Sequence, residues 1–175
     1  SSLAAGVAAP VLGWCARSTL ARDKSNAPPL RFGQMTYNHS RDWDHDTIIK
    51  NCTETQLEHV ELRTTHAHGV EVANSKAGRR EVRKRFEDAG LKLSLASAFA
   101  YHWDDPQNLQ ENIDGTKEYT LLAQDIGAIG IRVFPNALLV DQGIPEEKTV
   151  AQIARAVAEV GTFAAEHGVD RKSVV

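Results

Sequence analysis

Residues 59–97, HVELRTTHAHGVEVANSKAGRREVRKRFEDAGLKLSLAS, contain one full repeat of the pattern that decides the fold. Residues 59–63 alternate between polar and apolar side chains, as expected for a strand. Residues 78–89 then place apolar side chains along one side of a helix, with basic residues on the other faces. Gly90 follows, and residues 91–97 read as the next strand. This order is typical of a parallel sheet with helical crossovers.

The same order recurs along the chain. The expected strands are 31–37, 59–63, 91–97 and 130–134, and the expected helices are 44–57, 78–89, 105–126 and 146–167. Strand starts recur about every 35 residues, so eight units would need roughly 280 residues, close to the length of a (β/α)8 barrel. We therefore predict an α/β fold: a (β/α) TIM barrel truncated to about four βα units, or half barrel. A complete doubly wound sheet is the alternative, but no glycine-rich phosphate loop follows the first strand.

The expected helix ends carry specific residues. Asp105 and Pro106 form an N-cap with proline at the first helical position. Gly90, Gly127 and Gly168 follow three of the helices. Each glycine is expected to adopt the left-handed conformation that turns a helix back toward a strand. The last of them precedes residues 169–175, which begin like a fifth strand but turn polar at once, so we interpret this end as a truncation.

The first 29 residues differ from the rest of the chain. Residues 1–14, SSLAAGVAAPVLGW, are apolar and small, and resemble the tail of a twin-arginine export signal. A frayed N-terminal helix is the alternative. A polar linker, 18–29, ends in two prolines. We expect residues 1–29 to be a signal-like segment and linker, and 30–175 to be the N-terminal half of a TIM barrel domain. If residues 1–14 are an export signal, we expect the protein to be exported or periplasmic. If they are not, we expect it to be cytoplasmic.

Composition excludes several classes of protein. Of the 175 residues, 20 are Lys or Arg and 23 are Asp or Glu, and the net charge of -3 argues against nucleic acid as a partner. The 42% hydrophobic and 25% charged residues are typical of a globular protein, not a membrane protein. Cys15 and Cys52 do not form a paired metal-ligand spacing. The basic run 79–85 is interpreted as a solvated helix face, since acidic residues are interspersed.

Polar residues after the expected strands are the candidates for ligand binding. In a parallel barrel, the loops that follow the strands form the active-site face. The candidates to contact a substrate are Glu61, Arg63, His66, His68, His102, Arg132 and Asn136. All of them can hydrogen-bond to a polyhydroxylated ligand.

Glu61 and Arg63 lie two residues apart on one strand, so they point to the same face. This pair forms either the floor of an active site or a structural ion pair inside the barrel. The spacing of His66 and His68 allows both imidazoles to reach one zinc or manganese ion, but no carboxylate near them in sequence completes a site. Ligand contact without metal, or a plain loop, are the alternatives.

His102 and Arg132 offer two kinds of chemistry. The unperturbed pKa of histidine is near neutral, so His102 suits an acid or base, although the aromatic residues around it equally suit packing. Arg132 has a planar fork suited to a phosphate or carboxylate, with loop capping as the alternative. We expect Arg132 to face the surface, so that its replacement by alanine weakens substrate use with little loss of stability.

Three of these stretches resemble a known family. HVELRTTHAHGVE (59–71), SAFAYHWDDP (97–106) and GIRVFPN (130–136) are similar to the sugar phosphate isomerase/epimerase group with the xylose isomerase-like TIM barrel. The resemblance implies one divalent cation (Mn, Mg or Zn) in the full-length enzyme and a pair of glutamates that move a proton next to a carbonyl. Its metal ligands would lie on later strands, outside this chain. Gln56 departs from the pattern, because a glycine is usual after this helix, and we expect a looser turn there.

The resemblance favours a fragment of a metal-dependent sugar or sugar-phosphate isomerase or epimerase. The partner would be a small sugar or sugar phosphate. The alternatives are a phosphodiesterase of the abasic-site endonuclease type and a non-catalytic carbohydrate-binding or assembly protein. An unclosed parallel sheet also exposes unpaired strand edges, so we expect self-association through them and no isomerase activity from the 175 residues alone.

Overall fold

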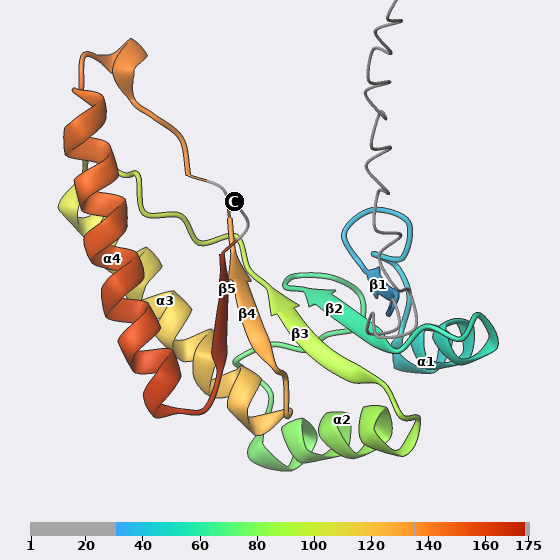
Figure 1. Ribbon diagram of the computed structural model, residues 1–175. Coiled ribbons are helices and arrows are strands. Elements are labelled where there is room, and N and C mark those ends of the chain that lie inside the picture. The colour runs from blue at the N-terminus through green and yellow to red at the C-terminus, as the bar shows by residue number, and fades with distance from the viewer. Residues whose placement is uncertain (1–30, 135, 174–175) are drawn as a thin grey trace, which may run out of the picture. The chain divides into compact units, whose positions relative to one another are not determined.

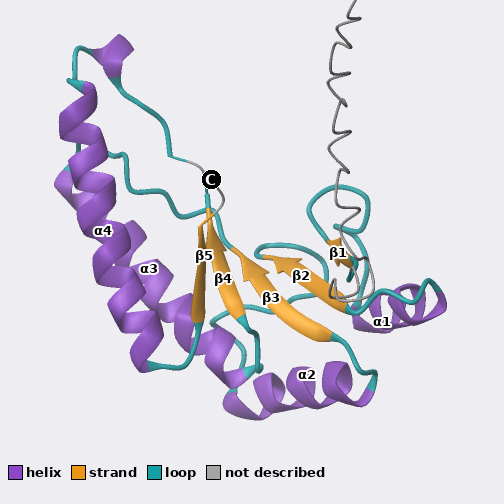
Figure 2. Cartoon of the chain, in the orientation of Figure 1, coloured by secondary structure: helices purple, strands orange, loops and turns teal. Residues whose placement is uncertain are grey.

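A computed structural model describes residues 31–134 and 136–173, which contain one five-stranded sheet. All strands are parallel and lie in the consecutive order β1-β2-β3-β4-β5. Figure 1 shows the four labelled helices on the same side of the sheet, and Figure 2 shows how strands and helices alternate along the chain. This is the arrangement of a partial (β/α) barrel, so the predicted fold class is confirmed. The apolar segment 1–14 and the linker lie outside the described residues.

The elements agree with the expected ranges to within a few residues. The strands are β1 (Gly33–Met35), β2 (His59–Arg63), β3 (Lys92–Ala96), β4 (Gly130–Val133) and β5 (Asp170–Ser173), and the helices are α1 (His45–Glu54), α2 (Lys76–Asp88), α3 (Pro106–Asp125), the short 3-10 helix η2 (Val140–Gln142) and α4 (Glu146–Glu166). Two differences stand out. β1 is shorter than the expected strand 31–37, and the polar segment after Val169 does form a fifth strand, since its backbone pairs with β4. Backbone pairing supplies the ladder hydrogen bonds whatever the side chains are.

Capping side chains set the starts of the helices. The carboxylates of Asp44 and Asp105 and the hydroxyl of Ser75 accept hydrogen bonds from backbone N–H groups of the first turns of α1, α3 and α2. At the other end, Gly90, Gly127 and Gly168 all have positive φ, as predicted. Gln56 has φ of 58° in the same role after α1. A residue with a Cβ is therefore strained at that turn.

The hydrophobic core lies between the sheet and its helices. Val60, Leu62 and Leu95 are fully buried, and they pack with Phe86 of α2 and Leu122 of α3. The alternate strand residues point to the opposite face, which no helix of residues 31–134 and 136–173 covers. That face carries polar residues of β2 and β4. None of the described helices is long and apolar enough to cross a membrane.

Two basic residues of α2 join it to other helices. Arg79 donates a 2.8 Å hydrogen bond to Asp125 at the end of α3, and Arg85 pairs with Asp46 of α1. Arg83 pairs with Glu87 one turn later. The pair of Arg83 agrees with the interpretation of 79–85 as a solvated helix face, whereas Arg79 is only 15% exposed and departs from it.

Candidate functional site

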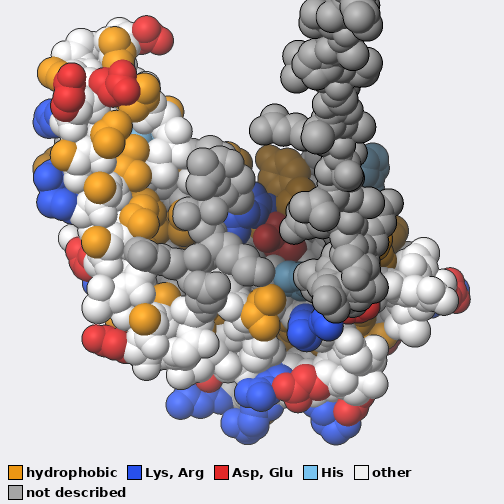
Figure 3. All heavy atoms as spheres, viewed as in Figure 1, with side chains coloured by type: hydrophobic (Ala, Val, Ile, Leu, Met, Phe, Trp, Pro, Cys, Tyr) orange, Lys and Arg blue, Asp and Glu red, His pale blue; other side chains and the backbone are white. Residues whose placement is uncertain are grey.

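The candidate residues are brought together at the carboxyl edge of the sheet, where β1 to β4 end. Parallel register aligns Met35 with Glu61, Arg63 with Ala96, and Ala96 with Arg132. Figure 3 shows basic, acidic and histidine side chains next to one another in the hollow of the helix-free face. The topology therefore gathers residues that are up to 71 positions apart in sequence.

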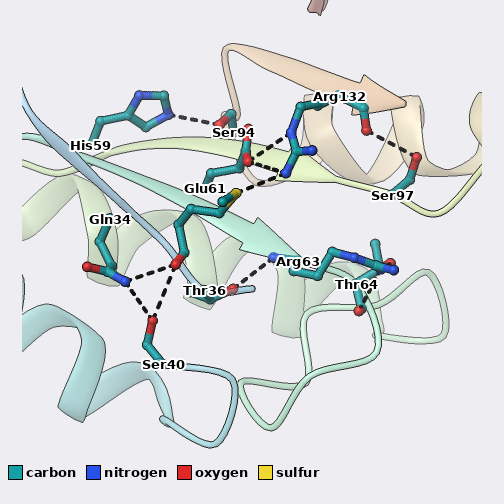
Figure 4. A network of polar contacts seen from close by, with 11 residues as sticks. Gln34, Thr36, Ser40, His59, Glu61, Arg63, Thr64, Ser94, Ser97 and Arg132 are labelled. Carbon is teal, nitrogen blue, oxygen red and sulfur yellow. Dashed lines mark hydrogen bonds and ion pairs between the residues drawn. The ribbon is translucent and has the colours of Figure 1, made fainter. Parts of the chain in front are cut away.

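Glu61 and Arg132 form an ion pair across this face (Figure 4). Arg132 donates from Nε and Nη2 to one carboxylate oxygen, Oε1 of Glu61, at 3.0 and 2.7 Å. The two side chains are only 17% and 19% exposed. Arg132 is thus mostly buried and paired, and the expectation of a surface-facing arginine is wrong.

The partner of Glu61 also differs from the expected Arg63. Glu61 and Arg132 lie on β2 and β4, which are separated by about 10 Å across β3. Ser94 and Ala96 of β3 point to the same face, and both side chains are small. Arg132 therefore extends over β3 to reach the carboxylate.

Arg63 has other neighbours. Its backbone N–H donates to Oγ1 of Thr36 at 2.9 Å, and its Nη1 donates to the carbonyl and the hydroxyl of Thr64 at 3.0 and 2.6 Å (Figure 4). The guanidinium carbon is 5.7 Å from the ring centroid of Tyr37 and 5.9 Å from that of Phe134. Cation–π attraction stabilises the charge there. Its Nε is buried and has no hydrogen-bond partner among the described residues.

The two histidines of the loop after β2 have different environments. His68 is buried, and both ring nitrogens are engaged: Nε2 bonds to the carbonyl of Arg63 at 2.8 Å, and Nδ1 accepts from the N–H of Val70 at 3.1 Å. Burial lowers the pKa of His68, because it penalises the charged ring. His66 is half-buried, with its ring centroid 6.4 Å from that of Tyr37, and its Nδ1 has no described partner. His68 therefore holds the loop and has no nitrogen free for a metal or substrate.

A strained residue separates Arg63 from these histidines. Thr65 has φ of 65°, which is rare for a β-branched residue. Its N–H donates to Oε1 of Glu71, and the other oxygen of Glu71 accepts from the hydroxyl of Tyr119. Burial and this hydrogen bond raise the pKa of Tyr119 well above its ordinary value. This support could not be predicted from sequence, because Glu71 and Tyr119 are far apart in the chain and neither lies at a strand end.

His102 and Asn136 lie in the loops after β3 and β4. The His102 ring stacks on Trp103 at 4.7 Å between centroids, and its Nδ1 is buried without a described partner. The side-chain oxygen of Asn136 accepts from the N–H of Tyr101, so Asn136 ties the two loops together. Tyr101 itself is fully buried and bonds to Thr116, and burial raises its pKa to about 12. Tyr101 therefore packs under the loop, as the packing alternative proposed.

The described residues do not fit a divalent cation. In 31–134 and 136–173, no group of three or more His, Cys, Asp or Glu side chains is placed to hold a metal ion. The ring centroids of His66 and His68 are 6.2 Å apart, but both nitrogens of His68 are already bonded. The spacing of these two histidines thus does not make a metal site here.

Comparison with known proteins gives one family match. The family described as "Xylose isomerase-like TIM barrel" matches residues 49–171. Among curated proteins, no sequence matches this chain.

Solved structures share the fold. A D-psicose 3-epimerase crystallised in the presence of D-fructose has 14% identity and a TM-score of 0.66, covering 81% of this chain and 51% of its own. The IolI protein with a binding zinc atom has 14% identity and a TM-score of 0.70, covering 82% and 51%. The probable 3-DHS dehydratase AsbF from Bacillus anthracis has 16% identity and a TM-score of 0.61, covering 81% and 51%. The chain thus spans about half the length of these structures, and at these identities the likeness establishes the fold alone.

Proposed function

Because the chain belongs to the xylose isomerase-like TIM barrel family, we propose that it is part of a metal-dependent sugar or sugar-phosphate isomerase or epimerase. Two solved structures on this fold are named as a D-psicose 3-epimerase and an L-ribulose 3-epimerase. The observation that carries the proposal is the polar edge on the helix-free face, where Arg63, His66 and the Glu61–Arg132 pair follow or end neighbouring strands. A sugar has many hydroxyl groups and needs such a set of donors and acceptors.

Three of the candidate residues are suited to contact the substrate directly. Arg63, His66 and His102 each have a ring or guanidinium nitrogen without a protein partner among the described residues. Buried polar atoms are normally hydrogen-bonded, and a bound ligand would supply the missing partner of these three nitrogens. We assign these three side chains to the substrate oxygens.

The other four candidates are suited to support the site. The Glu61–Arg132 pair would form its floor, because Oε1 of Glu61 accepts from both Nε and Nη2 of Arg132 and little of either side chain is exposed. His68 holds the loop after β2, and Asn136 joins the loops after β3 and β4. We propose that His68 and Asn136 position the substrate-contacting residues.

The proposed reaction moves a proton on the carbon next to a carbonyl. General acid–base groups within hydrogen-bond distance of that carbon are needed. Residues outside the described part of the protein would bind the cation and provide the carboxylates that transfer the proton. The role of this segment is then to bind and orient the sugar and to exclude water from one side of it.

The test uses the full-length protein in D2O with unphosphorylated and phosphorylated ketoses. We expect deuterium to be incorporated at the carbon next to the carbonyl, together with ketose interconversion, both followed by NMR. Both should be lost after chelation and restored by a divalent cation. His102→Asn should lower kcat/KM at least tenfold. His167→Asn is the matched control, because His167 follows α4 at the opposite edge of the sheet.

Other outcomes separate the alternatives. Cleavage of abasic DNA without deuterium exchange in any ketose would favour the phosphodiesterase. Sugar binding without exchange, in protein loaded with manganese, magnesium or zinc, would favour a carbohydrate-binding protein. Equal losses of activity in His102→Asn and His167→Asn would contradict the assigned role of His102.

A further inference from the structure

Two strand-end arginines share the helix-free face, and they differ in their partners. The fork formed by Nε and Nη2 of Arg132 is occupied by Glu61. Arg63 uses Nη1 for Thr64, and no carboxylate lies within ion-pair distance of it among the described residues. Nε of Arg63 is buried and unpartnered. The Nε side of the Arg63 fork, which suits a bidentate anion, therefore lacks an acceptor.

Two aromatic rings near Arg63 stabilise its positive charge without neutralising it. Tyr37 and Phe134 present their rings at 5.7 and 5.9 Å from the guanidinium carbon. These rings attract a cation but offer no acceptor in the plane of the guanidinium. Tyr37 is 39% exposed, so the ring that covers Arg63 is itself at the surface.

A second unpartnered nitrogen lies near the same ring. The His66 centroid is 6.4 Å from that of Tyr37, and Nδ1 of His66 is buried without a described partner. In the tautomer that carries its proton on Nδ1, His66 donates to an oxygen, as the Arg63 fork does. Arg63 and His66 thus give two kinds of donor in one loop.

The backbone between these donors is held in an unfavourable conformation. Thr65 has φ of 65°, and its N–H is fixed by Glu71. Strained residues persist only where the surrounding structure fixes them, and they are found most often at ligand sites. Thr65 lies in the turn that follows β2. This turn joins Arg63 at the end of β2 to His66.

We propose that Arg63 and His66 bind the anionic group of the substrate, a carboxylate or a phosphate. A neutral hydroxyl would accept a hydrogen bond from Nε but would leave the buried charge unbalanced, whereas an anion satisfies both. The inference rests on the proposed function in that the anion belongs to a sugar: the substrate class is an acidic or phosphorylated sugar. Inorganic phosphate and acetate stand in for the two sources of the anion.

The experiment titrates the 175-residue chain with sodium phosphate, sodium acetate and sodium chloride at equal ionic strength. The NMR signal of the Arg63 Nε–H, assigned by its loss in Arg63→Met, reports the binding. We expect saturation by phosphate or acetate and not by chloride, with Kd at least tenfold weaker in Arg63→Lys and His66→Phe. Arg31→Met, which removes an arginine that is 59% exposed, should leave Kd unchanged. Circular dichroism checks that each variant is folded.

The outcomes separate this inference from the proposed function. Anion binding that is equal in the wild type, Arg63→Lys and His66→Phe, or a folded wild type that no anion saturates, would overturn the anion site. If neutral ketoses are turned over by the full-length enzyme as well as acidic ones, and Arg63→Lys does not change the ratio, the anion site fails while the isomerase stands. Anion binding through Arg63 without any ketose exchange would support the anion site and contradict the proposed isomerase function.

Discussion

The Glu61–Arg132 pair leads to a quantitative prediction about stability. Replacement of Arg132 by methionine, which is similar in length, removes both donors and leaves a carboxylate that is 19% exposed without a partner. Breaking a fully buried pair in this way costs about 3–5 kcal/mol, whereas an exposed pair contributes at most about 1 kcal/mol. About four fifths of each side chain is buried, and the second oxygen of Glu61 accepts no hydrogen bond among the described residues. We therefore expect Arg132→Met to lower the free energy of unfolding by about 2–3 kcal/mol.

The assay is urea unfolding of the chain at pH 7, followed by circular dichroism. The double variant Glu61→Gln/Arg132→Met removes the stranded charge, so it should lie within about 1 kcal/mol of the wild type. Arg31→Met is the control, because the pair of Arg31 with Glu58 is 59% and 54% exposed. If Arg132→Met costs no more than Arg31→Met, or if the double variant is as unstable as the single one, the pair is not buried as the structure has it.

Four further outcomes are expected. Burial lowers the pKa of His68 below its ordinary value of 6.5, so the folded state holds this proton less tightly than the unfolded chain does. The contribution of neutral His68 to the free energy of unfolding is therefore complete above about pH 6.5 and is lost as the pH falls below it. The urea midpoint should fall between pH 7.5 and pH 5 in the wild type, and should fall less in His68→Gln. Gln56→Gly should relieve the strain at φ of 58° and raise the free energy of unfolding by up to about 1 kcal/mol, measured by thermal melts. Gly115→Ala would place its Cβ 2.5 Å from a ring carbon of Phe99 and should destabilise the chain by about 1–3 kcal/mol. Gly78→Ala is the control, because the nearest contact of its Cβ is at 3.6 Å, and it should be neutral or stabilising. Equal melting temperatures of the two variants would contradict the packing of Gly115 against Phe99. The sheet edges β1 and β5 should make the chain self-associate, and a monomer in size-exclusion chromatography with light scattering would refute this.

Local rules predicted most of the elements. The alternation in 59–63 identified β2 to the residue, and Asp105 with Pro106 identified the start of α3. Helix ends followed from the glycines, and Gln56 occupies the left-handed position where a glycine was missing. These features depend on a few neighbouring residues, and a sequence contains that information directly. β5 was the exception. Its polar sequence does not indicate a strand, which forms because its backbone pairs with β4.

The partners of the candidate residues could not be predicted in the same way. Arg63 and Arg132 occupy equivalent positions near the carboxyl ends of their strands, and from sequence both were candidates to contact a substrate. Arg132 reaches Glu61 because the side chains between them on β3 are small, a condition that depends on the register of three strands. Arg63 has aromatic rings on two sides instead, and its Nε is left without an acceptor. Position at a strand end therefore selects the residues that can reach a ligand, and the lateral neighbours decide which of them are still free to bind it. Of the two arginines, Arg63 has the free donor, so mutations there should alter ligand binding more than stability, with the opposite order for Arg132.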